Sequence, residues 1–443
     1  MKIPRRPPPI EGLLKTAFMD AARLERIIAV GPVVKGRYEH WDKLKYRPRP
    51  EGLSLEDWWT GLKLARSKLV RSIALTDKEG QPFRFGTPDH ILRGLHEIDQ
   101  SASGRIELAE AVTDSTTRDR YIISSLIEES ITSSQLEGAS TTTDAAKNMI
   151  RSGRNPTDKS EQMIWNNYHA MQFVRRNQAA ALTPELVFEL HRVVTEDTLG
   201  LSEKAGALRT DDDVVRVERR GRVLHVPPPA SELPARMRLM CRFANERPQD
   251  VFVHPIIRAI ILHFWVGHDH PFVDGNGRTA RALFYWSSLS QGYWLAEYLS
   301  ISRILKEEPA QYARAFLLTE TDENDLTYFI EYQLDVINRA MTDLQAYLRR
   351  KMEEVRKLEG LLRESVRLNH RQLALLTHAL RHPGHTYTIE SHKMSHNVVY
   401  QTARSDLMDL AERGILGKTK RGRSFQFTAP DNLAKRLQAL GSR

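Results

Sequence analysis

One short segment of the sequence gathers residue types that suit the handling of phosphate groups. It covers residues 270–281 and reads HPFVDGNGRTAR. His270 offers an imidazole that can carry a proton. Asp274 offers a carboxylate that can hold Mg²⁺ between phosphate oxygens. Arg278 and Arg281 lie three residues apart, so on a helix they project from nearly the same face as two cationic clamps. This set of groups predicts transfer of a phosphorus centre.

The residues before the first arginine predict an anion cradle. Gly275 and Gly277 flank Asn276, immediately before a predicted helix. Glycine lets backbone N–H groups approach an anion closely. The first turn of a helix adds unpaired donors and partial positive charge. Each of these residues has an ordinary structural explanation when taken alone, but their combination at this spacing favours chemistry.

Two helices are expected to hold this loop. Apolar residues between 256 and 265 form a wide face, as in a buried helix. That helix must end near Gly267, because Pro271 disfavours helical backbone at His270. A second helix is expected to begin near Gly277. The loop therefore lies between two packed helices.

The segment 270–281 resembles, without a departure, the Fic family signature HPFx(D/E)GNGRxxR, and the resemblance extends over roughly 115–345. It implies a helical fold that transfers AMP from ATP, with Mg²⁺, to a Ser, Thr or Tyr hydroxyl of a target protein or of the chain itself. Such a protein is an adenylyltransferase. By position in the signature, the implied roles are general base for His270, Mg²⁺ ligand for Asp274, anion hole for Gly275, Asn276 and Gly277, phosphate contact for Arg278, γ-phosphate contact for Arg281 and core anchor for Phe272.

A second segment resembles the inhibitory motif of the same family, (S/T)xxxE(G/N). It reads SSQLEG over residues 133–138, at the end of a helix expected over about 117–138. Ser133 and Glu137 are four residues apart and share a face of that helix. The resemblance implies that Glu137 pairs with Arg281 and excludes the γ-phosphate. Ser133 is expected to steady the Glu137 carboxylate by a hydrogen bond.

The stretch 214–226, VVRVERRGRVLHV, alternates and turns at Arg220-Gly221, which predicts a β-hairpin. It resembles the family's flap, which pairs with an extended target segment by strand addition. A purely structural hairpin is an equal alternative on the sequence. The residues expected to position a target are Val215, Val217, Val223 and His225.

A rival chemistry is open in the same region. His268-Asp269 is an HD dyad, and it clusters in sequence with His263 and His270. A metal-dependent phosphohydrolase uses such groups. Those sites usually lie on continuous helices, whereas this dyad leads directly into Pro271 and a glycine loop. The longer signature therefore favours the transferase.

The end of the chain has a different character. Residues 361–443 hold 14 Lys/Arg and 6 Asp/Glu, so nearly all of the net charge of +9 lies there. Helices followed by a basic two-stranded hairpin predict a winged helix-turn-helix. Such a domain binds DNA or another protein, and the alternative to an enzyme is a DNA-binding regulator in which the central region is regulatory. The candidate DNA contacts are Gln401, Thr402, Arg404, Lys418, Lys420, Arg421 and Arg423.

These segments define the expected organisation. The fold class is mainly α, with one hairpin in the centre and the winged helix at the end. The expected regions are an N-terminal helical region (1–110), the Fic-like region (111–345), a helical linker (346–364) and the winged helix (365–443).

The amino-acid composition excludes several classes of protein. With 41% hydrophobic and 27% charged residues, the chain is not a disordered or fibrous protein. No long uncharged apolar stretch predicts a membrane span, and the start, MKIPRRPPPIEGLL, lacks the apolar core of a secretory signal. Cys241 is the only cysteine, so no internal disulfide forms. We therefore expect a cytoplasmic protein without a membrane partner. Its oligomeric state is open, and a homodimer is one option.

Overall fold

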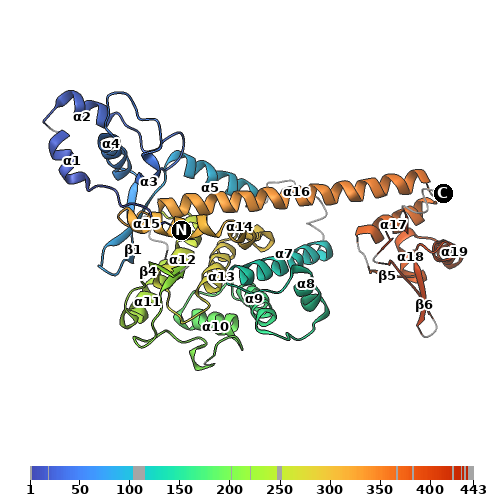
Figure 1. Cartoon of the computed structure of the whole chain (residues 1–443). Coiled ribbons are helices and arrows are strands. Elements are labelled where there is room, and N and C mark those ends of the chain that lie inside the picture. Colours follow the sequence, from blue (N-terminus) through green and yellow to red (C-terminus); the bar gives the residue numbers. More distant parts are fainter. Residues whose placement is uncertain are drawn as a thin grey trace. The chain divides into compact units, whose positions relative to one another are not determined.

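The computed structural model describes the chain except for residues 1, 18, 103–114, 201, 220, 247–251, 366–367, 382–383, 422–423, 431, 434–435 and 438–443. The fold is mainly helical, with small antiparallel sheets (Figure 1). The chain divides into two compact units. The first combines Met1–Ile106 with Ser124–Met341, and the second combines Glu107–Ile123 with Thr342–Arg443.

The first part of the first unit holds short helices and a strand pair. Its elements are α1 (Ile10–Ala17), α2 (Ala21–Ile28), α3 (Trp41–Leu44), α4 (Leu55–Ser67), β1 (Val70–Thr76), β2 (Pro82–Gly86) and α5 (Asp89–Ala102). The antiparallel pair β1–β2 was not among the elements expected from the sequence. It is positioned by a distant segment: the Arg84 N–H donates to the Asn324 carbonyl, and the Leu326 N–H donates to the Arg84 carbonyl.

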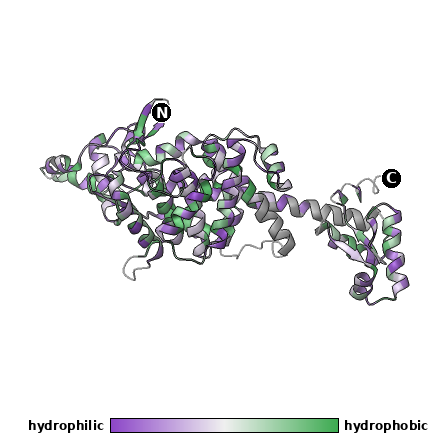
Figure 2. Cartoon of the chain, turned by 90° about the horizontal axis from the view of Figure 1, so that it is seen from below, coloured by the Kyte–Doolittle hydropathy of each residue, from purple (hydrophilic) through white to green (hydrophobic). Residues whose placement is uncertain are grey.

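The helices of the central part of the chain follow, including the two on either side of the signature loop. They are α7 (Ser115–Leu136), α8 (Thr143–Ser152), α9 (Lys159–Arg176), α10 (Pro184–Thr195), α11 (Leu233–Asn245), α12 (Pro255–Asp269), α13 (Asn276–Ser290), α14 (Ile301–Glu307), α15 (Pro309–Thr321) and α16 (Thr327–Ser365), with the 3-10 turns η1 (Ser202–Lys204), η2 (Ala230–Glu232) and η3 (Trp294–Tyr298). Figure 2 shows hydrophobic and hydrophilic residues interspersed along the helices of the chain, as expected for helices with one buried face. Helix α12 is buried on nearly all sides. It packs along α13, so the loop between them is held from both ends.

The expected central hairpin is present but shorter than its alternating pattern. Strand β3 (Val217–Arg219) pairs antiparallel with β4 (Arg222–His225), and the register shifts between Val217 and Glu218. Val214 is exposed and lies outside the pairing. Alternation alone therefore overestimated the paired length.

The second unit ends in a small α/β arrangement with its own core. Its elements are α17 (His370–Arg381), β5 (Thr386–Thr388), α18 (Ile389–His396), α19 (Tyr400–Glu412), β6 (Gly417–Arg421) and β7 (Ser424–Thr428). The strands form one antiparallel sheet in the order β5-β7-β6, so β5 adds a third strand to the expected pair. Buried Leu376, Leu407, Leu410 and Phe427 form part of the core. Among the residues that the structure describes, no helix is both long enough and apolar enough to cross a membrane.

Candidate active site

The signature loop is built by two helix ends with left-handed backbone. Helix α12 closes at His270, which has φ 46°, and α13 begins after Gly275, which has φ 83°. A side chain at Gly275 would also come within 2.6 Å of a Thr195 methyl group. The loop therefore requires glycine at this position, both for conformation and for space.

The Asn276 side chain holds the loop rather than pointing out of it. Its Oδ1 accepts a hydrogen bond from the Phe272 N–H at 3.0 Å, and its Nδ2 donates to the Phe272 carbonyl at 2.8 Å. Phe272 itself is fully buried, as expected for an anchor. Asn276 can therefore contribute to an anion site only through its main-chain N–H, at the start of α13.

Two residues that the sequence analysis did not single out also position the loop. His191 on α10 stacks on Phe272 with ring centroids 3.7 Å apart. Its Nδ1 accepts from the Gly206 N–H at 2.9 Å, so its Nε2–H donates to the Asp274 carbonyl at 2.8 Å. Arg209 donates from Nε to the His270 carbonyl at 2.9 Å. The one available signal was a histidine within the apolar stripe of α10.

His270 has the state that a general base needs. Its Nδ1 lies 3.3 Å from the Gly267 carbonyl, a contact that only an N–H can make. The lone pair of the neutral ring is then on Nε2. Burial lowers the pKa of His270 to about 4, so the ring is unprotonated at neutral pH. It can therefore accept a proton.

Asp274 presents an accessible carboxylate at the loop tip. Its side chain is 54% exposed, and its Oδ1 accepts from the Gly275 N–H at 2.7 Å. Its Oδ2 lies 3.7 Å from Nη2 of Arg278. Carboxylate oxygens that are open to solvent suit Mg²⁺, which retains several waters when it binds through one or two carboxylates and phosphate.

Arg278 is buried with donors left over. Its Nη1 donates to the Val194 carbonyl at 2.9 Å, whereas Nε and Nη2 make no hydrogen bond within the described part of the chain. Burial lowers the pKa of Arg278. Burying a cation whose N–H donors make no hydrogen bond costs free energy, unless an anion accepts hydrogen bonds from them. These donors fit a phosphate group bound at the start of α13.

Glu137 occupies the neighbouring anion position. Its carboxylate accepts from Nη2 of Arg281 at 2.9 Å, and its side chain is 34% exposed. A Cβ atom added at Gly277 would overlap the Glu137 carboxylate. The carboxylate therefore lies directly against the glycine that the signature places in the anion hole. The structure brings residues 137, 277 and 281 together across 144 positions of sequence.

Ser133 has a different contact from the one expected. Its Oγ accepts from Nε of Arg281 at 2.8 Å, and its carbonyl accepts from Nη2 at 3.1 Å. The hydroxyl thus holds the arginine, and the arginine holds Glu137. The i,i+4 spacing on the helix was compatible with a direct Ser133–Glu137 bond, but the buried guanidinium offers the better donor.

The histidines of the HD rival do not form one site. Asp269 accepts from Arg236 at 2.7 Å, from Trp265 Nε1 at 3.0 Å and from His268 Nδ1 at 3.1 Å. Burial opposes ionisation of Asp269, but the bonds from His268 and Arg236 outweigh it and lower its pKa. His263 is buried against the Tyr312 hydroxyl. The Asp269 carboxylate is therefore already committed to protein donors.

The remaining candidates lie in two places. In the hairpin, Val215, Val217 and Val223 are half-buried, and His225 points toward Glu320 and the end of α12.

In the second unit, the candidate DNA contacts lie on two elements. Gln401 and Arg404 are exposed on α19, Thr402 is half-buried there, Lys418 and Lys420 are exposed on β6, Arg421 ends β6, and Arg423 lies outside the described residues.

The comparisons with known proteins agree with this loop. A model of the Fic/DOC family matches residues 181–287. Protein adenylyltransferase Fic of Drosophila grimshawi is 30% identical over 117 residues, which are 26% of this chain and 22% of that protein. The Drosophila yakuba protein of the same name is 38% identical over 69 residues, 16% of this chain and 14% of its own. The chain thus spans about a fifth or less of these curated relatives.

A solved structure extends the likeness of the fold. The crystal structure of a Fic family protein from Desulfovibrio desulfuricans matches with a TM-score of 0.52 and 18% identity. The match covers 78% of this chain and 97% of that one. The chain therefore contains a Fic/DOC family domain at residues 181–287, within the first unit.

Proposed function

We propose that this protein transfers AMP from ATP to a hydroxyl side chain of a protein. The observation that carries the proposal is the buried guanidinium of Arg278 beside the start of α13, whose Nε and Nη2 make no hydrogen bond among the described residues. An anion is needed there, and the loop also supplies a neutral histidine and an accessible carboxylate. The name of the Drosophila relatives, protein adenylyltransferase, supports this chemistry.

Each loop residue has its own role in the proposed reaction. The target oxygen bonds to the α-phosphorus as the α–β bridging bond breaks and pyrophosphate leaves. His270 accepts the hydroxyl proton at Nε2. The main-chain N–H groups at the start of α13, with Arg278, stabilise negative charge on the phosphates. Asp274 would hold Mg²⁺, which neutralises phosphate charge when bound. The open strand pair β3–β4 would position an extended target segment by strand addition.

We also propose that the chain inhibits its own transferase activity. Arg281 would contact the γ-phosphate, but it already holds Glu137. A tethered carboxylate acts at high effective concentration, so it can compete without being a strong ligand. The triphosphate would then be kept from the in-line geometry that attack requires.

The most direct test is mass spectrometry. Purified protein is incubated with Mg²⁺ and, separately, each nucleoside triphosphate, alone and with cell lysate. We expect an adduct of AMP mass on the chain itself or on a lysate protein, because the site has a base and an anion cradle. If a different nucleoside triphosphate gives a nucleotidyl adduct, that triphosphate and not ATP is the donor. No adduct from any donor, even when Glu137 is replaced, would refute the transferase.

Asp274→Ala should lose transfer through weakened Mg²⁺ binding. Because the variant keeps His270, we expect excess Mg²⁺ to restore part of the activity. The measurement is labelled-AMP incorporation against Mg²⁺ concentration, in the Glu137→Gly background. Asp274→Asn is a matched variant that keeps the size of the side chain, and it should show the same shift. Equal rescue of a His270→Ala variant would show that the two roles are wrongly divided.

For the second unit we propose a winged helix that binds DNA. The observation that favours it is the shared exposure of a helix and a strand: Gln401 and Arg404 on α19, with Lys418 and Lys420 on β6. Amide and guanidinium groups on a helix suit base edges, and basic strand residues suit phosphates. A protein-interaction module is the competing function, and exposed Val399 and Tyr400 at the start of α19 would serve it.

The DNA proposal predicts a steep salt dependence for the full chain. Phosphate contacts release counterions, so affinity should fall as salt rises. Replacing Lys418, Lys420, Arg421 and Arg423 with glutamine should reduce the slope of log K against log salt by roughly 0.9 for each residue that contacts phosphate. The control removes equal charge from the first unit, at exposed Lys68, Lys78, Lys159 and Arg242. Absence of binding at low salt, or equal effects of both sets, would favour a protein partner.

A further inference from the structure

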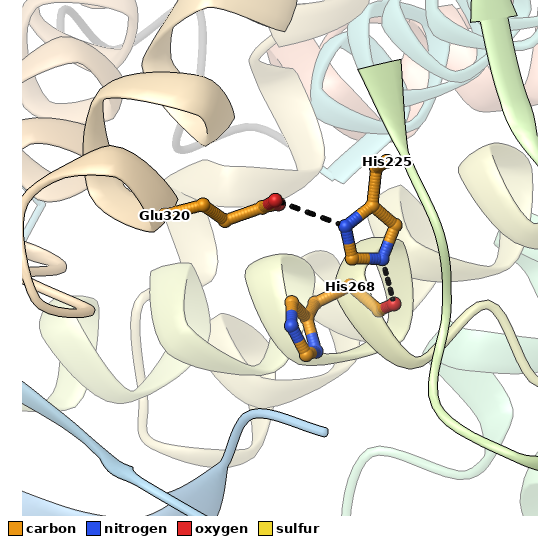
Figure 3. Close-up of side chains that lie close together, drawn as sticks. All are labelled: His225, His268 and Glu320. Atoms are coloured by element: carbon orange, nitrogen blue, oxygen red, sulfur yellow. Dashed lines mark hydrogen bonds and ion pairs between the residues drawn. The ribbon is translucent and has the colours of Figure 1, made fainter. Parts of the chain in front are cut away.

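Three side chains from separate elements meet beside the end of α12. His225 comes from β4, His268 from α12 and Glu320 from α15, and each brings a ligand atom so that all lie within 4.8 Å of one another. Figure 3 shows the Glu320 carboxylate and the His268 ring beside the His225 ring. The signature loop does not use these groups. Two imidazoles and a carboxylate are typical ligands of zinc.

The hydrogen bonds around the two histidines match those of metal ligands. Nε2 of His225 lies 2.7 Å from the His268 carbonyl, so this nitrogen carries a proton and Nδ1 faces Glu320 at 3.0 Å. Nδ1 of His268 donates to Asp269, which leaves the lone pair of the neutral ring on Nε2. Metal-binding histidines commonly donate their other N–H to a carbonyl or carboxylate in this way.

The outer partner of His268 is itself rigidly held. Asp269 accepts two hydrogen bonds from Arg236, at 3.0 and 2.7 Å, and one from Trp265. The His268 ring also lies against the rings of Phe83 and Phe264. One ligand is therefore preorganised in the core. The other two keep access to solvent, since the side chains of His225 and Glu320 are 11% and 21% exposed.

We propose that His225, His268 and Glu320 bind one Zn²⁺ ion, with water in the fourth position. In the metal-free protein a proton bridges Nδ1 of His225 and the Glu320 carboxylate. The ion would take the place of that proton, which passes to solvent. His225 would then ligate through Nδ1 and His268 through Nε2, and both outer hydrogen bonds would be kept.

The ion would join the hairpin to two core helices. His225 ends β4, and His268 stands two residues before His270. Zn²⁺ would therefore fix the second hairpin strand beside the proposed base. This consequence for target positioning rests on the proposed function, whereas binding of the ion does not.

The test is a Zn²⁺ titration by calorimetry of tag-free, full-length protein. The protein is first treated with chelator, and nucleotide is left out because its phosphates would themselves bind Zn²⁺. We expect one saturable site per chain and proton release that depends on the buffer. His225→Asn and Glu320→Gln should each weaken Zn²⁺ binding by at least about tenfold, the lower limit seen even for loss of an outer partner.

Two matched variants control for the loss of any imidazole or carboxylate. His96→Asn on α5 and Glu307→Gln on α14 change exposed residues outside the cluster and should bind Zn²⁺ as the parent does. Zn²⁺ should also raise the melting temperature of the parent more than that of the His225 and Glu320 variants. A parent without a saturable site, or cluster variants that bind like the controls, would overturn the proposal. A parent titration decides the matter even if a variant does not fold.

Discussion

His270→Ala should lower AMP transfer by roughly 10²–10⁴-fold, the usual contribution of a positioned acid or base. The reason lies in the state of the ring. Burial lowers the pKa of His270 to about 4, and the Gly267 carbonyl directs the ring so that Nε2 is free to accept a proton. The measurement is the initial rate of labelled-AMP incorporation. It should be made in the Glu137→Gly background, because the parent rate is expected to be low.

The control must separate lost chemistry from lost structure. His270 also closes α12 in left-handed backbone, so the thermal unfolding of the variant should be compared with that of the parent. His96→Ala removes an exposed imidazole on α5 and should leave the rate unchanged. We also expect ATP to bind the His270→Ala variant, because the phosphate contacts remain. Full transfer by a folded His270→Ala variant would remove the base from the mechanism.

Glu137→Gly should raise auto-modification strongly. The carboxylate holds Nη2 of Arg281 at 2.9 Å and lies against Gly277, so its loss frees both a cation and the space over the anion hole. Couplings between two binding events on one protein are typically about 1–3 kcal/mol, which corresponds to about 5–150-fold in affinity. We expect the rise to fall in that range. The measurement is labelled-AMP incorporation by the variant beside the parent at equal ATP.

Related variants distinguish charge from shape. Glu137→Gln keeps the size of the side chain and loses the charge, so it should activate less than glycine. Ser133→Ala removes the acceptor at 2.8 Å from Nε of Arg281 and should activate only weakly. Arg281→Ala should not activate, because it loses the proposed phosphate contact together with the inhibitory pair. Gln135→Gly tests whether loosening the end of α7 is sufficient, and we expect no activation. Equal rates for Glu137→Gly and the parent would refute self-inhibition.

Parts of this site were readable because their geometry is local. Within 270–281, proline and glycine determine where one helix stops and the next begins, and helical spacing places Arg278 and Arg281 on one side. The structure ends the first helix and begins the second close to where the sequence analysis placed these boundaries, and it buries Phe272. The hairpin was also predictable, although its paired strands are shorter than the alternation suggests.

Other parts depend on residues that are distant in sequence. His191 on α10 supports the loop, and no residue near it in the sequence indicates that its ring stacks on Phe272. Strand β2 is held by Asn324 and Leu326, so the pair β1–β2 was missed. The contact of Ser133 with Arg281 rather than Glu137 depends on where a buried guanidinium points. In each case the deciding partner is brought in by packing, which periodicity does not encode.

The sequence by itself determined which functional groups the loop carries, because their order along a helix–loop–helix is local. Only the tertiary structure decided what stands next to the loop. It brings Glu137 to Arg281 across 144 residues, and it buries Arg278 with two nitrogens that make no hydrogen bond to any described residue. It also gathers His225, His268 and Glu320 from three elements. The physical reason is that a buried charged group needs a hydrogen-bonding or oppositely charged partner. Tertiary packing determines which residues lie close enough to be that partner.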